Sequence, residues 1–131
     1  MEDEVKDKHY AYFFTRQDIF PEYQLVQTAH AALKLGVRSQ QPWDEEDVER
    51  LGVPQRRDID PDETYFTVIG VRDLQALRAV EEILDKFGFL HEVFVEPDIG
   101  NEETSIAVYP VHEKDRGVLM AFDLLRFKNK G

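Results

Sequence analysis

The chain has 131 residues, and 42% of them are apolar, which is enough for one soluble domain with a hydrophobic core. It carries 16 basic and 27 acidic residues, a net charge of −11 that should repel nucleic-acid phosphates. It contains no cysteine, which excludes disulfides, thiolate metal sites and thiol nucleophiles.

The chain begins with a charged tail, residues 1–8, where a signal peptide would need an apolar run. No apolar stretch approaches the roughly 20 residues that cross a bilayer. We therefore expect a cytoplasmic protein without membrane contact, folded as a single α/β domain over residues 9–131. Within it, residues 37–63 are rich in acids and proline and predict an acidic insertion, either a solvated surface excursion or a lid.

The first element is predicted to be a central strand. Residues 9–15, HYAYFFT, are apolar at successive positions, as in a strand covered on both faces. A polar cluster, residues 15–18, follows at its carboxyl end, where open α/β sheets receive ligands, although an ordinary turn fits too. Pro21 and Glu22 suit a first helical turn and predict a helix over about 21–35, ended by Gly36.

Because successive residues of a helix advance by about 100°, the side chains of this one fall into two stripes along its surface. The apolar stripe is predicted to be the buried face and comprises Leu25, Val26, Ala29, Ala32 and Leu33. The polar stripe comprises Tyr23, Gln27, His30 and Lys34, spaced so that neighbours touch along one line. It is either the wet side of an amphipathic helix or a row that binds a ligand.

The rest of the chain adds three strands and further helices. Asp44 predicts the cap of a short helix that reaches Leu51. Residues 64–71 predict a second well-buried strand, and Asp73 caps a helix closed by Gly88. Residues 91–96 and 104–109 predict a less buried strand and a fourth strand that pair as an antiparallel hairpin.

The predicted fold is therefore a four-stranded mixed β-sheet flanked by helices, in which the helix-linked strands run parallel. A short helix is predicted near residues 113–120. The segment FDLLRFK after it fits either a strand edge or an irregular segment.

The sequence lacks the common short motifs of catalytic and phosphate-binding sites. The chain has no glycine-rich phosphate loop, no His-Glu-x-x-His and no serine in a nucleophile elbow. Its four histidines lack metal-ligand spacing, so we expect no metal site.

Two segments resemble the type II peptidyl-tRNA hydrolase family. Arg16, Gln17 and Asp18 end a strand, and the helix after it reads VQTAHAA, similar to the family's Ala-Gln-x-x-His-Ala-Ala signature. Asp98 to Gly100 resemble its Asp-Ala-Gly turn, and Thr104 opens a strand similar to its Thr-Val-Leu-x-Ile-x-Pro strand. The matches cover both ends of the chain in the family's order.

The resemblance implies hydrolysis of the ester between a peptide and the terminal ribose of tRNA, without a cofactor. Asp98 would activate water, Thr104 would hold the water or the carbonyl, and Gln27 and His30 would position the ester. Arg16, Asp18, Tyr23 and Lys34 would contact the substrate.

The chain departs from the family at two places. The family's Asp-Ala-Gly-Arg-Thr-Gln turn is shortened at residues 98–103, so its arginine and first threonine are absent. The family's Gly-Lys pair before the helix signature is replaced by Glu22 and Tyr23, so its lysine is missing. Two alternatives therefore stand beside hydrolysis: a non-catalytic module that binds a small nucleotide or a protein in the same pocket, and a structural role for Gln27 and His30. The aromatic-rich chain also permits a homodimer.

Overall fold

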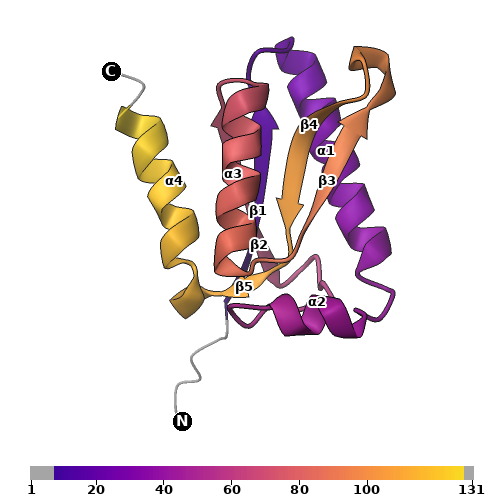
Figure 1. Cartoon of the computed structure of the whole chain (residues 1–131), viewed down its shortest axis with the longest axis vertical. Helices are drawn as coiled ribbons and strands as arrows, with labels where there is room; N and C mark the ends of the chain where they lie inside the picture. Colours follow the sequence, from indigo (N-terminus) through magenta and orange to yellow (C-terminus); the bar gives the residue numbers. More distant parts are fainter. Residues whose placement is uncertain (1–7, 129–131) are drawn as a thin grey trace.

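The protein folds as one α/β domain around a mixed five-stranded sheet (Figure 1). The computed structural model describes residues 8–128, with side chains up to residue 122. The main strands lie in the order β2-β1-β4-β3, and their bounds are β1 His9–Arg16, β2 Thr64–Val71, β3 His91–Glu96 and β4 Glu102–Val108. Strand β5, Val111–His112, pairs with the start of β1. Apart from Lys8, the predicted charged tail lies outside the described residues.

Helices cover the two faces of the sheet unequally. Their bounds are α1 Pro21–Arg38, α2 Glu45–Arg50, α3 Leu74–Phe87 and α4 Gly117–Lys128, with short 3₁₀ turns at η1 Pro97–Ile99 and η2 Glu113–Asp115. Figure 1 shows α3 in front of the sheet with α4 beside it, whereas α1 crosses behind β3 and β4. No helix within the described part of the chain is long and apolar enough to cross a membrane.

Strand β1 is the centre of the core, as its continuous apolar run predicted. Tyr12 and Phe14 pack with residues of α3 and α4, whereas Ala11 and Phe13 pack with α1 on the other face. All four are buried because β1 lies between β2 and β4, with helices on both sides. The parallel pairing of β1 with β2 and the β3–β4 hairpin also agree with the prediction.

Strand β2 is not the well-buried strand that its composition predicted. It lies at the edge of the sheet, and Phe66 and Val68 are about half exposed. Residue type reports the preference for extended backbone, but the position of a strand within a sheet depends on chain topology.

The predictions for α1 were wrong in two respects. The helix continues through Gly36 to Arg38, because the left-handed turn that makes glycine a stop does not form there. Its buried residues are Gln27, Ala31 and Leu35, whereas Leu25, Val26 and Leu33 of the predicted buried face are exposed.

The remaining elements follow their local signals. The Asp44 carboxylate accepts a hydrogen bond from the Asp47 N–H and begins α2 inside the acidic insertion. The Asp73 carboxylate accepts one from the Ala76 N–H, and Gly88 ends α3 with φ of 75°. The backbone of the undecided segment FDLLRFK is helical and belongs to α4. Among the described residues, the short strand β5 was not predicted.

Replacement of Asp73 by alanine should destabilise the protein by about 1 kcal/mol, because the first N–H groups of a core-forming helix lose their acceptor. Urea denaturation measures the change. The matched control is Asp44→Ala, which removes the same cap from a helix that buries no residue. The control should lower the free energy of unfolding clearly less than Asp73→Ala does. Equal losses would contradict the idea that the Asp73 cap matters because α3 packs in the core.

Candidate functional site

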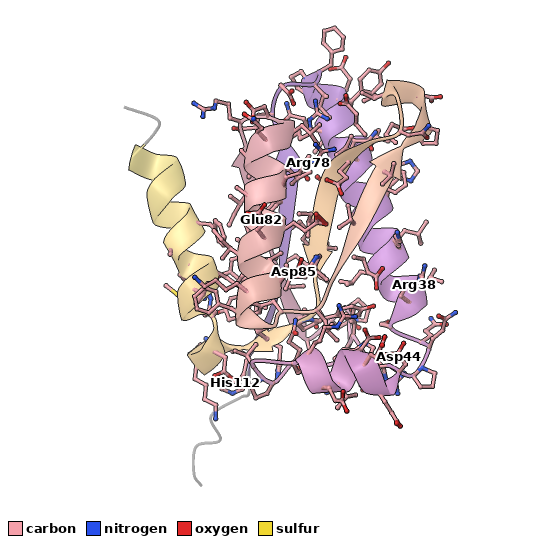
Figure 2. All side chains as sticks on the ribbon, in the orientation of Figure 1. Arg38, Asp44, Arg78, Glu82, Asp85 and His112 are labelled. Atoms are coloured by element: carbon pink, nitrogen blue, oxygen red, sulfur yellow. The ribbon has the colours of Figure 1, made fainter. Side chains whose placement is uncertain are left out.

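A charged cluster closes the carboxyl end of β1. The Arg16 guanidinium donates to both carboxylate oxygens of Asp18 at 2.8 Å and to Glu102 Oε1 at 2.8 Å. Its hydrogen bonds to Asp18 hold the pKa of that carboxyl below its ordinary 3.8. Arg78 of α3, labelled in Figure 2, lies 3.4 Å from Glu103 at the same corner. Because Arg16 is buried and occupied by two carboxylates, it is not free to bind an anionic ligand.

A chain of side-chain hydrogen bonds, buried at its Thr104 end, joins α1 to β4 and β3. The Thr104 hydroxyl donates to Gln27 Oε1 at 2.7 Å, and Gln27 Nε2 donates to Glu96 Oε1 at 2.9 Å. Thr104 is fully buried and Gln27 is 3% exposed. These two predicted site residues therefore meet, as adjacent hydrogen-bond partners, and their geometry fits positioning of Glu96 rather than contact with a bound molecule.

Glu96 is the residue that the sequence reasoning missed. Its side chain accepts from Gln27 and also from the main-chain N–H of Asp98, at 3.1 Å. The hydrogen bonds from Gln27 and then from the Asp98 N–H hold the pKa of Glu96 below its ordinary value. The local signal at this place is Pro97, which suits the first position of a helical turn, but glutamate is not a preferred capping residue and gave no sign of the role of Glu96.

Two surface grooves are lined by other residues of α1 and by residues next to Glu96 and Asp98 in the chain. The first, of about 600 Å³, joins the turn after β1 to η1 and is lined by Gln17, Asp18, Ile19, Phe20, Pro21, Tyr23 and Ile99. The second, of about 490 Å³, lies between α1 and β3 and is lined by His30, Leu33, Lys34, Val37, Arg38, Phe94 and Val95. The predicted substrate-binding residues are thus divided between two places on the surface.

The second groove holds two of the predicted residues through contacts with β3. The His30 ring stacks on Phe94, with ring centres 4.5 Å apart and planes 8° apart. Lys34 Nζ donates to the Val93 carbonyl at 2.8 Å. His30 and Lys34 therefore lie beside β3, whereas Asp18 and Tyr23 line the first groove.

Asp98 does not itself line the first groove. It belongs to η1, next to the groove-lining Ile99, and its side chain is exposed. Its main-chain hydrogen bond to Glu96 is what connects it to Gln27 and Thr104. Chemically, this arrangement offers an exposed carboxylate on a fixed turn, beside an open groove with aromatic walls.

Within residues 8–128, no three His, Asp or Glu side chains gather as a group that could hold a metal ion. No protein-family model matches the chain, and no curated protein is significantly similar to it.

The buried contact between Thr104 and Gln27 predicts a strong energetic coupling. Thr104→Val and Gln27→Met each keep the side-chain volume but leave a buried polar partner unpaired, which should cost about 1 to 3 kcal/mol. The double variant removes both hydrogen-bonding groups. Its loss in free energy of unfolding should therefore be smaller, by about 1 kcal/mol, than the sum of the losses of the two single variants. Urea denaturation of the four proteins measures this coupling, and simple additivity would contradict it.

The pair of Asp18 and Arg16 predicts a dependence of stability on pH. Because the folded-state pKa of Asp18 lies below its unfolded value, its contribution is complete above the unfolded pKa and is lost as pH falls through the folded pKa. The melting temperatures of the natural protein and of Asp18→Asn should therefore converge as pH falls from about 6 to about 3. A constant difference over that range would show that ionisation of Asp18 adds nothing.

Proposed function

We propose that this chain is a divergent protein of the type II peptidyl-tRNA hydrolase kind, and that the first groove receives the ester end of a peptidyl-tRNA. One observation carries the proposal. The groove is walled by Asp18 and Tyr23 from the turn and helix after β1, and by Ile99 from the turn that contains Asp98. These two segments, about eighty residues apart, are the ones that carry the family resemblance.

The position of the groove supports ligand binding independently of that resemblance. It lies at the carboxyl end of the central strand β1, the place where open α/β sheets bind ligands. Its aromatic and proline side chains suit the apolar parts of a ribose and a peptide.

In the proposed reaction, a water molecule attacks the ester carbonyl carbon. The Asp98 carboxylate accepts the proton of that water, and the bond from the carbonyl carbon to the ribose oxygen breaks. The ribose oxygen takes up a proton, so the products are a free peptide acid and a tRNA with a free terminal hydroxyl. Glu96 holds the Asp98 main chain, and Gln27 with Thr104 holds Glu96.

Two features predict that the reaction is slow. The family's lysine is replaced by Tyr23, and loss of one preorganised donor commonly costs on the order of 10² to 10³ in rate. The net charge of −11 also opposes the approach of tRNA phosphates, so we expect weak substrate binding that improves as added salt screens this repulsion.

The direct test is release of labelled peptide from peptidyl-tRNA by the purified protein under single-turnover conditions. Asp98→Asn should abolish the release, because an amide cannot accept the proton. Asp58→Asn is the matched control, since it removes an exposed carboxylate of the insertion, and it should leave the rate unchanged. Absence of release at high protein concentration would overturn the hydrolase proposal.

A second variant tests the missing cation. Tyr23→Lys should raise the rate of release by about 10-fold or more, because it returns a positive charge to the groove wall. Val48→Lys adds the same charge to the exposed side of α2 and should change the rate little. Equal acceleration by both variants would assign the effect to net charge rather than to the site.

A non-catalytic nucleotide-binding module is the second candidate, and one contact favours it. Phe20 and Tyr23 form an edge-to-face pair, with centres 6.0 Å apart, and both are largely exposed on the wall of the groove. Exposed aromatic faces at a groove stack well on nucleobases.

This candidate predicts that a mononucleotide raises the melting temperature and that Tyr23→Ala abolishes the rise. Val48→Ala, which truncates an exposed side chain elsewhere, should preserve it. If no mono- or dinucleotide shifts the melting temperature, nucleotide binding is contradicted, whatever the outcome of the hydrolysis assay.

A further inference from the structure

An apolar row runs along the outward side of α1. Leu25, Ala29, Leu33 and Val37 follow one another at intervals of four, so they form one ridge on the helix surface. Leu25 is 75% exposed and Leu33 is 66% exposed. A helix of a monomeric protein normally turns its charged side chains to this position, so a row of this kind marks an interaction surface.

Helices cover only part of the face of the sheet on which α1 packs. A four-stranded sheet is roughly 19 Å wide at the spacing between strands, which is about the width of two packed helices. On one face, α3 contacts β1 and β4 while α4 contacts β2. On the other face, α1 is the helix that packs, against β1, β3 and β4, and Trp43 and Ile59 of the insertion add to the same cluster.

The uncovered strip on that face belongs to β2 and is apolar. Phe66 is paired in register with Ala11, and Val68 is paired with Phe13, so all four side chains point to the α1 face. Phe66 and Val68 remain 50% and 52% exposed. The β2 strip is thus an exposed apolar floor with room for a second helix, on the opposite side of α1 from the groove that Leu33 and Val37 line.

We propose that a second copy of this chain covers this surface, with each copy's α1 row lying on the partner's β2 strip. The surface is self-complementary, because every copy presents both a protruding row and an uncovered strip, as a two-fold interface requires. The row itself carries no charge between Leu25 and Val37, so burying it desolvates no ion.

The charges at the ends of α1 fit an antiparallel pairing of the two helices. Glu22 stands in the first turn and Arg38, labelled in Figure 2, stands in the last. When two such helices run antiparallel, Glu22 of one copy comes near the partner's Arg38, and the opposed helix dipoles attract. A parallel pairing would instead bring like charges together.

The size of the surface sets the strength of the association. Half-exposed leucine, valine and phenylalanine side chains each leave roughly 70 to 100 Å² accessible, so the row and strip offer roughly 500 Å² per copy. This is less than the roughly 800 Å² per partner of a standard stable interface. The dimer should therefore be weak and concentration-dependent, with a micromolar dissociation constant.

Sedimentation velocity of the whole chain from about 1 µM to about 500 µM tests the proposal. The apparent mass should rise toward twice the 15.3 kDa of one chain. Leu33→Glu should weaken the dimer at least about 10-fold by placing a charge in the row. Val48→Glu, which makes the same apolar-to-acid change at an exposed residue of α2, should have no effect. Far-ultraviolet melting of each variant verifies that it is folded.

Variants of the strip and of the helix ends test the geometry. Phe66→Glu, or Val68→Lys if the first fails to fold, should weaken the dimer as Leu33→Glu does. Glu22→Arg and Arg38→Glu should each weaken it, and the double variant should recover it. A mass of one chain throughout the range overturns the proposal. A dimer that survives Leu33→Glu, or one that responds to the row but not to the strip, also overturns it.

Discussion

The hydrogen bond from Thr104 to Gln27 determines how α1 lies on the sheet. Both side chains are almost fully removed from water, so neither can lose its partner without a cost of about 1 to 3 kcal/mol. The bond directs the Gln27 side of α1 toward β4. Glu96 then completes the amide's hydrogen bonding, and its second oxygen holds the turn that carries Asp98. One buried contact thus orients a helix, a carboxylate and a turn.

The orientation of α1 leaves apolar side chains exposed on the side of the helix that faces away from the sheet. With Gln27, Ala31 and Leu35 facing the sheet, the more apolar stripe of the helix faces outward. The same geometry leaves the β2 strip without a helix above it. The surface that suits a second copy is therefore a consequence of the polar contact that builds the candidate site, because one helix cannot bury both of its stripes on one sheet.

The charged groups of the candidate site are mainly carboxylates. Arg16 is neutralised by Asp18 and Glu102, and Glu96 is held in its ionised form, so carboxylates outnumber free cations at this end of the sheet. Such a site can activate water or accept protons from a hydroxyl, but it gives little attraction to phosphate. Tyr23 and Phe20 supply aromatic surface where a lysine would supply charge.

The sequence by itself determined the elements whose signals are local. The apolar run of β1, the Asp73 cap and the Gly88 stop of α3, and the β3–β4 hairpin needed only neighbouring residues, and each formed as predicted. Tertiary structure alone decided the edge position of β2, the inward face of α1 and the role of Glu96. Those depend on contacts between residues far apart in the chain, such as Gln27 with Thr104, whose strength comes from burial that no local pattern encodes.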